Sequence, residues 1–318
     1  MKVRASIAAL AIAFVGPIAA TAQDDARTDI YSVDLETGAA TSVGFVEESV
    51  DGMALGLDGL VYLLTDDDQL LTATIDGTGD ADTAITSDTS LEITGLGDGE
   101  NLIGIDIRPA TDQLFAISDA SIVYFIDVTT GVAVAPGAAT DPAIEADALG
   151  FDFNPTVDRI RVDVSTTQNL RLNPDTGAVG TNPDTSEPTI DGNIAFAEGD
   201  ENVDATPAVV GAGYTNSVAD AEETQLYVID AETDVLALQD PPNDGTLNTV
   251  GSLDVDVNGS AAFDITVDGS AFLTVSSDDA EFTEGDSGAT PASDDATPAS
   301  DDDEDDLDED EDATPSAG

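Results

Sequence analysis

Residues 150–162 read GFDFNPTVDRIRV, and the alternation of apolar and polar side chains on both sides of a proline-containing turn is typical of a β-hairpin. If Asn154 lies opposite Arg159, then Asp152 lies opposite Arg161, and acidic and basic side chains pair across the strands. Four apolar side chains occupy the other face: Phe151, Phe153, Ile160 and Val162. The stretch therefore predicts two antiparallel strands with one apolar and one charged face.

The hairpin belongs to a unit that recurs along the chain. Strands of the same kind begin at Gly52, Gly104, Gly150, Gly211 and Ala262, at spacings of 46 to 61 residues. A turn of the form Asp/Asn-x-x-Thr-Gly recurs at 34–38, 127–131 and 173–177. In such a turn Asp or Asn hydrogen-bonds the backbone, and Gly takes a positive φ. Units of this length suit the four-stranded blades of a β-propeller.

The two ends of the repeat region complete one another. The region begins with the third and fourth strands of a unit, 30–35 and 40–45, and ends with the first and second, 262–266 and 271–275. Paired in one sheet, these strands close a ring and remove its free edges. We therefore predict an all-β fold, a five-bladed β-propeller closed by its N-terminal and C-terminal strands. A β-sandwich is the alternative, but it explains neither the repeats nor the divided unit.

Composition divides the chain into three parts. Residues 1–22 have a basic start, an apolar core and an Ala-Thr-Ala end, which predicts a signal peptide cleaved near Ala22 and a secreted, extracellular or periplasmic protein. The apolar run is too short and interrupted for a membrane span, so we expect none in the mature chain. Residues 23–277 hold the propeller-like domain. Residues 278–318 repeat an Ala-Thr-Pro-Ala-Ser-Asp-Asp motif and then become almost wholly acidic, which predicts a disordered tail.

The charged composition excludes several kinds of chemistry. The formal charge is −60, and the chain has no Cys and no His. Disulfides, thiolate metal sites and His-activated nucleophiles are therefore excluded, as is lysine chemistry once the signal peptide is removed. The negative surface argues against nucleic acid as a partner. Because the acids are spread over the whole chain, they favour adaptation to a saline exterior over dedicated cation-binding loops.

Three stretches resemble an uncharacterised secreted bacterial family, domain of unknown function 4394. They are GIDIRP at 104–109, the hairpin at 150–162 and NLRLNPDTG at 169–177. YTN at 214–216 and PPNDGTLNTVG at 241–251 also match its pattern. The resemblance covers roughly residues 30–275 and implies a propeller-like, exported domain. It implies no activity and no site residue, and this chain differs from the family in its acidity and its Asp-rich tail.

The polar face of the hairpin is the first candidate site. It gathers three of the five arginines that remain outside the signal peptide. Arginine forks bind carboxylates through two hydrogen bonds, so one interpretation is a site for an anion or a sugar acid. The other is a buried ion-pair network between blades. The residues concerned are Asp152, Asn154, Arg159, Arg161, Asn169 and Arg171, with Arg108 from the preceding unit.

The third position of the innermost strands is the second candidate, occupied by Asp106, Asp152 and Asp264. Innermost strands line the central channel of a propeller, so these carboxylates could converge on a bound Ca²⁺ or a water. Each could equally accept hydrogen bonds from the backbone of the next blade or from Arg108. Ca²⁺ is the one cofactor that the sequence suggests, and nothing in the sequence requires it.

These observations favour a secreted, non-catalytic β-propeller, a monomer that acts as a binding or scaffold domain in a saline or cation-rich exterior. Its partner would be an unknown extracellular ligand or surface component. The alternative is an extracellular carboxylate- or calcium-dependent hydrolase or lactonase on the same fold. No pair stands out among the 67 acids, and no Trp is present to stack on a sugar.

Overall fold

The computed structural model describes residues 26–57, 59–75, 77–145, 148–181, 188–257 and 259–277, all within one compact unit, Met1–Phe282. The predicted signal peptide and acidic tail lie outside these residues. The described chain is built from strands and one 3₁₀ turn (Pro242–Asp244), with no α-helix. Accordingly, this part of the chain contains no helix that could cross a membrane.

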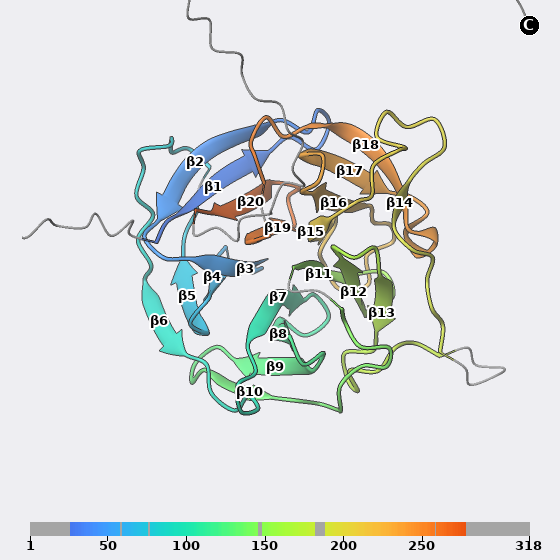
Figure 1. Cartoon of the computed structure of the whole chain (residues 1–318). Helices are drawn as coiled ribbons and strands as arrows, with labels where there is room; N and C mark the ends of the chain where they lie inside the picture. Colours follow the sequence, from blue (N-terminus) through green and yellow to red (C-terminus); the bar gives the residue numbers. More distant parts are fainter. Residues whose placement is uncertain are drawn as a thin grey trace, which may run out of the picture. The chain divides into compact units, whose positions relative to one another are not determined.

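The strands form five sheets, or blades, arranged around an axis (Figure 1), which confirms the predicted five-bladed propeller. Blade 1 contains β3 (Val50–Leu55), β4 (Val61–Thr65), β5 (Gln69–Ala73) and β6 (Thr89–Glu92). Blade 2 contains β7 (Leu102–Arg108), β8 (Gln113–Ser118), β9 (Val123–Asp127) and β10 (Val132–Val134). Blade 3 contains β11 (Leu149–Asn154), β12 (Arg159–Val164) and β13 (Asn169–Leu172). Blade 4 contains β15 (Val209–Tyr214), β16 (Leu226–Asp230), β17 (Val235–Gln239) and β18 (Thr246–Ser252), and β14 (Ala195–Phe196) joins its outer edge.

Blade 5 is the divided unit. It consists of β19 (Ala261–Ile265), β20 (Ala271–Ser276), β1 (Thr28–Val33) and β2 (Ala40–Val46). β1 pairs with β20 in antiparallel register from Thr28↔Ser276 to Val33↔Ala271. The first and last described strands of the chain therefore share one sheet, as predicted, and the ring closes through backbone hydrogen bonds.

The recurring Thr-Gly turns form as predicted. In the turn after β1, Asp34 accepts a hydrogen bond from Glu36 N at 2.8 Å, and Gly38 has a φ of +82°. Gly131 and Gly177 occupy the same place with φ of +72° and +69°. Only Gly adopts this conformation without strain, which explains its repetition in the sequence.

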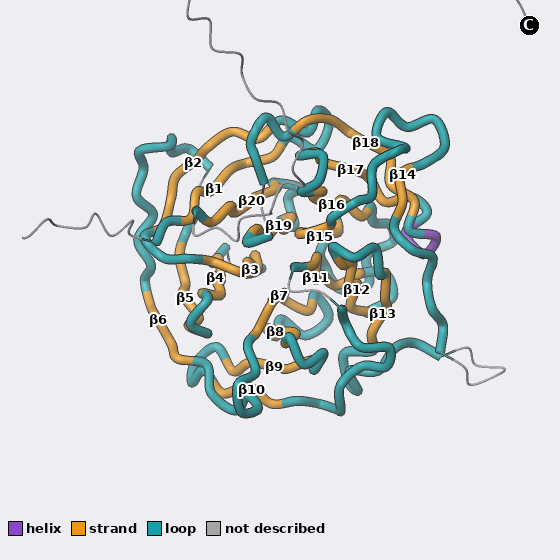
Figure 2. Tube along the Cα trace, viewed as in Figure 1, coloured by secondary structure: helices purple, strands orange, loops and turns teal. Residues whose placement is uncertain are grey.

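Five innermost strands, β3, β7, β11, β15 and β19, surround the axis, and each contacts its neighbours in the ring (Figure 2). Glycines near the beginning of β3, β7, β11 and β15 allow this close approach. A Cβ built on Gly150 would lie 2.5 Å from Ala212 Cβ, and one on Gly211 would lie 2.7 Å from Phe263 Cβ. The repeated Gly that marks each unit in the sequence is therefore a packing requirement of the ring.

Apolar clusters fill the interfaces between most blades. Separate clusters join blade 1 to blade 2, blade 2 to blade 3, blade 4 to blade 5, and blade 5 to blade 1. The remaining cluster lies in blade 4 and the segment before it, and among the described residues it includes no side chain of blade 3. The interface between blades 3 and 4 is therefore held in a different way.

Blade 3 is also the sheet with the fewest strands among the described residues, with three. Between β13 and β14 the described residues form two single bridges, Leu172↔Val179 and Thr181↔Pro188. The segment from Pro188 then leads to β14, which runs parallel to β18 at the outer edge of blade 4. This connection carries a polar segment, Asp191–Asn193, across the boundary between the two blades.

Candidate functional site

The hairpin of blade 3 has the predicted register. Asp152 lies opposite Arg161, and Asn154 lies opposite Arg159. Arg171 and Asn169 follow on the same side of the sheet, opposite Arg161 and Asp163. The predicted pairing of Asp152 with Arg161 is nevertheless wrong, because the Asp152 carboxylate accepts a hydrogen bond from Tyr214 N while the Arg161 guanidinium contacts other groups. Tyr214 of blade 4 and Asp191 of the connecting segment lie against this face and supply these other partners.

Arg161 is the centre of a buried network between blades 3 and 4. Its side chain is 1% exposed. The guanidinium donates to Asp191 at 2.8 Å and to Asn243 at 2.8 Å. It also donates to Asn169 and, more weakly, to the Tyr214 hydroxyl at 3.3 Å. The network thus replaces apolar packing at this interface and supports the structural interpretation of Arg161 and Asn169.

Asp191 holds two arginines at once. Besides Arg161, it accepts two hydrogen bonds from Arg171, at 2.7 and 2.8 Å. Asp191 is 3% exposed, whereas the Arg171 side chain is 31% exposed. Arg171 therefore extends from the buried network towards the surface.

Two oxygens of the network have no partner among the described residues: Asp163 Oδ2 and Gln239 Oε1. The other ends of these side chains contact each other, with Gln239 Nε2 3.4 Å from Asp163 Oδ1. Burial raises the pKa of Asp163 to about 6, against the opposing effect of the Arg161 charge. A protonated Asp163 would be a hydrogen-bond donor at this place.

Arg108 makes a second contact between blades. It donates to both oxygens of Asp158, at 2.8 and 2.5 Å, and to Asp175 at 2.9 Å. These hydrogen bonds hold the pKa of Asp158 below its usual range. Arg108, at the end of β7, thus binds two turns of blade 3 and takes no part in the Arg161 network. Its charge is fully compensated, which favours a structural role.

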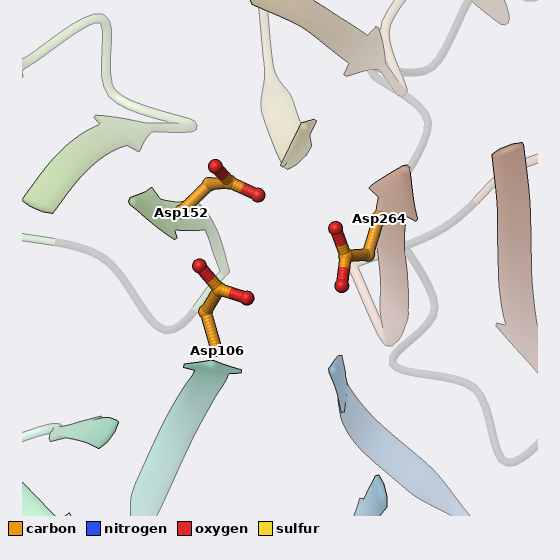
Figure 3. Close-up of side chains that lie close together, drawn as sticks. All are labelled: Asp106, Asp152 and Asp264. Atoms are coloured by element: carbon orange, nitrogen blue, oxygen red, sulfur yellow. The ribbon is translucent and has the colours of Figure 1, made fainter. Parts of the chain in front are cut away.

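Asp106, Asp152 and Asp264 come together, as predicted, although they belong to three different blades (Figure 3). One oxygen from each lies within 4.8 Å of those of the other two. All three residues are buried, between 2% and 4% exposed. The Asp152 carboxylate is therefore shielded from solvent at the axis of the ring.

The oxygens of this trio are bound by backbone amides of the innermost strands. Asp106 and Asp264 each accept from the following residue at 2.6 Å and from the next blade at 2.7 Å. Asp152 accepts from the next blade at 3.3 Å. In this way three carboxylates serve all five equivalent amides of the ring, where blades 1 and 4 carry Ala54 and Gly213 instead of Asp. The five donors are the N–H groups of Leu55, Ile107, Phe153, Tyr214 and Ile265.

The pKa values of all three carboxyls are raised. Burial raises the pKa of Asp264 to about 7. Burial and the neighbouring carboxylates raise the pKa of Asp106 and of Asp152 well above the usual range. The contact between the Asp152 and Asp264 carboxyls adds to the rise in the pKa of Asp152. We call this arrangement of Asp106, Asp152 and Asp264 the axial belt.

The outer end of the blade 3 face is open. Arg159 is half-buried and donates only to backbone carbonyls, Asp158 O at 2.7 Å and Val157 O at 3.5 Å. Asn154, its partner in register, accepts from Thr156 within the hairpin turn. Arg159 and Arg171 together line a pocket of about 840 Å³, a volume that includes its solvent-open mouth. The predicted arginine set is therefore divided: Arg161 and Asn169 are buried, and Arg159 and Arg171 reach a pocket.

Sequence reasoning missed the partners of Arg161. Asp191 and Asn243 lie in connecting segments far from the hairpin in sequence, and neither lies in a repeated element. Tyr214 and Asn243 lie within stretches that match the family pattern. That match is the one feature of the sequence that could have pointed to them as partners of Arg161.

A family model described as domain of unknown function (DUF4394) matches residues 77–285. Among curated proteins, none matches the chain significantly. Among solved structures, Myxococcus xanthus glutaminyl cyclase is 10% identical with a TM-score of 0.44, covering 78% of this chain and 94% of that one. A protein of unknown function from Bacteroides caccae is 9% identical, with a TM-score of 0.35 and coverages of 66% and 68%. Citrobacter koseri AztD is 11% identical, with a TM-score of 0.33 and coverages of 72% and 49%. At these scores the likenesses carry no argument about function.

Proposed function

Because the chain belongs to the domain of unknown function (DUF4394) family, whose description assigns no activity, we propose a function from the geometry alone: a secreted, non-catalytic binding domain. In this proposal the propeller is a rigid scaffold at the cell exterior, and its ligand is an extracellular molecule or surface component. Export and adaptation to a saline exterior, both inferred from the sequence, belong to the same proposal.

The observation that carries the proposal is the axial belt. A carboxylate that acts as a catalytic acid, base or nucleophile must reach its substrate. The belt carboxylates are between 2% and 4% exposed, and their oxygens accept hydrogen bonds from the backbone or from one another. Such groups hold the ring together, and this supports a scaffold over a hydrolase that uses these acids.

The experiment compares binding with turnover on the full chain. The protein is applied to an array of extracellular polysaccharides and, separately, to a panel of esters, lactones and glycosides with and without millimolar calcium. We expect saturable binding to at least one polymer and no turnover. Turnover that the Asp152→Asn variant abolishes while its unfolding midpoint is retained would overturn the proposal in favour of a hydrolase or lactonase.

The saline part of the proposal rests on charge. A formal charge of −60 makes the folded chain repel itself, and dissolved salt screens this repulsion. We expect the thermal unfolding midpoint to rise with NaCl from low to molar concentration. A midpoint that is independent of salt would contradict the adaptation. Recovery of the chain from the culture exterior, with an N-terminus near residue 23, tests export.

A further inference from the structure

We propose that the pocket at the outer end of blade 3 binds the carboxylate of an acidic sugar, with Arg159 and Arg171 as the groups that recognise the charge. The pocket lies beside the last residues of the sheet, where the described residues continue blade 3 past β13 as single bridges. Without its solvent-open mouth the pocket has a volume of about 380 Å³, which lies in the range of pockets for small molecules. This inference rests on the proposed binding function and names the class of ligand.

Positive charge is the first argument. Elsewhere in the described chain the guanidinium groups of Arg27 and Arg108 are held by carboxylates. Arg159 has no carboxylate partner among the described residues, and only its Nη1 donates, to two carbonyls. Within the described part of the chain, Arg159 thus keeps donors for a ligand carboxylate, which an arginine can bind through two parallel hydrogen bonds.

The carboxylates near the two pocket arginines are bound to other groups or lie inside the interface between blades 3 and 4. Asp191 is shared between Arg161 and Arg171, so it cannot neutralise both. Asp163, inside the interface, is buried away from the pocket, and burial raises its pKa to about 6. Asp158 and Asp175, on the neighbouring turns, are occupied by Arg108. Among the described residues that line it, the pocket therefore has two arginines and no carboxylate, although the molecule as a whole is negative.

Neutral polar groups are the second argument. Besides the two arginines, the pocket is lined by an amide, Asn173, and by the hydroxyls of Thr176, Thr181 and Thr189. These side chains both donate and accept hydrogen bonds, which suits the hydroxyls of a sugar ring. Val179 and Ala178 supply apolar surface. A carboxylate next to a polyhydroxyl ring matches this combination better than a bare inorganic anion does.

Calorimetric titration of the full chain tests the inference, at fixed ionic strength and pH 7. The probes are D-glucuronate and D-galacturonate, with D-glucose as the uncharged counterpart and acetate and sulfate as anions without a sugar ring. We expect saturable binding of a uronate, none of glucose, and weaker binding of acetate and sulfate. Arg159→Gln should weaken uronate binding about tenfold, the worth of one charge-assisted hydrogen-bond pair.

Two further variants separate the roles in the pocket. Arg27→Gln removes an arginine in another blade and should leave uronate binding unchanged. Thr189→Val keeps the shape of the side chain and should weaken uronate binding while leaving the weak binding of acetate unchanged. Since Arg159 makes no salt bridge among the described residues, Arg159→Gln should keep the unfolding midpoint of the wild type, and this is checked in the same samples.

Three results would overturn the inference: no saturable binding of either uronate up to about 20 mM, equal binding by the wild type and Arg159→Gln, or acetate and sulfate binding as tightly as the uronates. If another polymer still binds without turnover, only the pocket assignment fails and the proposed function stands. Turnover of a substrate would instead remove the proposed function itself.

Discussion

The contacts of Arg161 are determined largely by the side chains that the neighbouring blade places next to it. It is 1% exposed and donates hydrogen bonds to side chains of blades 3 and 4 and of the segment that joins them. Its cross-strand partner, Asp152, is directed to the axis instead. Charged neighbours in one sheet therefore have separate roles, one at a blade interface and one in the axial belt.

Replacement of Arg161 by leucine should destabilise the fold. In Arg161→Leu the buried Asp191 keeps only Arg171, and three polar side chains lose their donor. We expect a loss of about 3–5 kcal/mol in the free energy of unfolding, the usual effect of breaking a buried ion pair. Urea unfolding measures it. Arg27→Gln, which breaks a half-exposed ion pair, is the control and should cost at most about 1 kcal/mol; equal effects of the two changes would show that the network is not structural.

The axial belt makes stability depend on pH in a defined direction. A carboxyl whose pKa is raised by folding stabilises the folded state at low pH, and this stabilisation is lost as the pH rises through the raised pKa. For Asp264 that value is about 7, so the wild type should be less stable at pH 8 than at pH 5. The measurement is urea unfolding at both values in the same high salt.

Asp152→Asn should reduce this loss. The amide oxygen can still accept from Tyr214 N, and the amide nitrogen can donate to Asp264, so the belt keeps its hydrogen bonds with one fewer titrating group. We expect the change in stability between pH 5 and pH 8 to shrink by on the order of 2 kcal/mol. Glu198→Gln, an exposed acid, should behave like the wild type.

A loss in Asp152→Asn as large as in the wild type would contradict this account of the belt. Calcium gives an independent check. At matched ionic strength, millimolar calcium should leave the unfolding midpoint of the wild type unchanged. A calcium-dependent rise that Asp152→Asn abolishes would instead assign the three carboxylates to a cation.

At the scale of the strand, the innermost elements explain the repeat itself. β3, β7, β11 and β15 carry a Gly where the next strand in the ring approaches most closely, and β19 carries the small Ala262. Alternation in β12 places its apolar side chains on one face of the blade, where Ile160, Val162 and Val164 pack towards blade 2. A blade is therefore recognisable in the sequence because two local rules, small residues inside and alternation outside, recur together.

Gly150→Ala tests the packing rule. The added methyl group would lie 2.5 Å from Ala212 Cβ and 2.7 Å from Ala212 N, so the backbones of β11 and β15 must separate. We expect a loss of about 1–3 kcal/mol in the free energy of unfolding, as for other overpacked cores. Gly180→Ala is the matched control, since its nearest atom would be 3.9 Å away. Similar midpoints for the two variants would refute the packing explanation.

At the scale of the molecular unit, the ring is closed at blade 5 and held differently at one interface. Blade 5 joins the two ends of the described chain through β1 and β20. Between blades 3 and 4 the Arg161 network takes the place that apolar clusters have elsewhere. The polar interface opens at its outer end into the pocket of Arg159 and Arg171, so the irregular part of the ring is also the part with a proposed ligand.

Truncation tests the closure. A chain that ends after residue 277 keeps β19 and β20 and should unfold cooperatively with the midpoint of the full chain. A chain that ends after residue 260 lacks both strands, exposes the edge of β1 and leaves Leu55 N without its acceptor on Asp264. We expect it to lose cooperative thermal unfolding, as followed by circular dichroism. Cooperative folding of the shorter chain would show that the ring does not need this sheet.

The fold could be predicted from the sequence because its determinants are local and repeated. The Asp/Asn-x-x-Thr-Gly turns and the small residue near the start of each innermost strand are properties of short segments. The five innermost strands and the divided unit at the two ends specify the ring. The convergence of Asp106, Asp152 and Asp264 followed from the same repeat, since equivalent positions of a ring meet at its axis.

The fate of the arginines was decided only by the tertiary structure. Register placed Asp152 opposite Arg161, but pairing depends on which groups the adjoining segments present. These groups are Tyr214, Asn243 and Asp191, all distant in sequence, and the last two lie outside the repeated elements. The same geometry buries Arg161 and leaves Arg159 at a pocket, although the two are only two residues apart on one strand face. Local pattern determines which face a side chain occupies; the segments that cover that face determine what it binds.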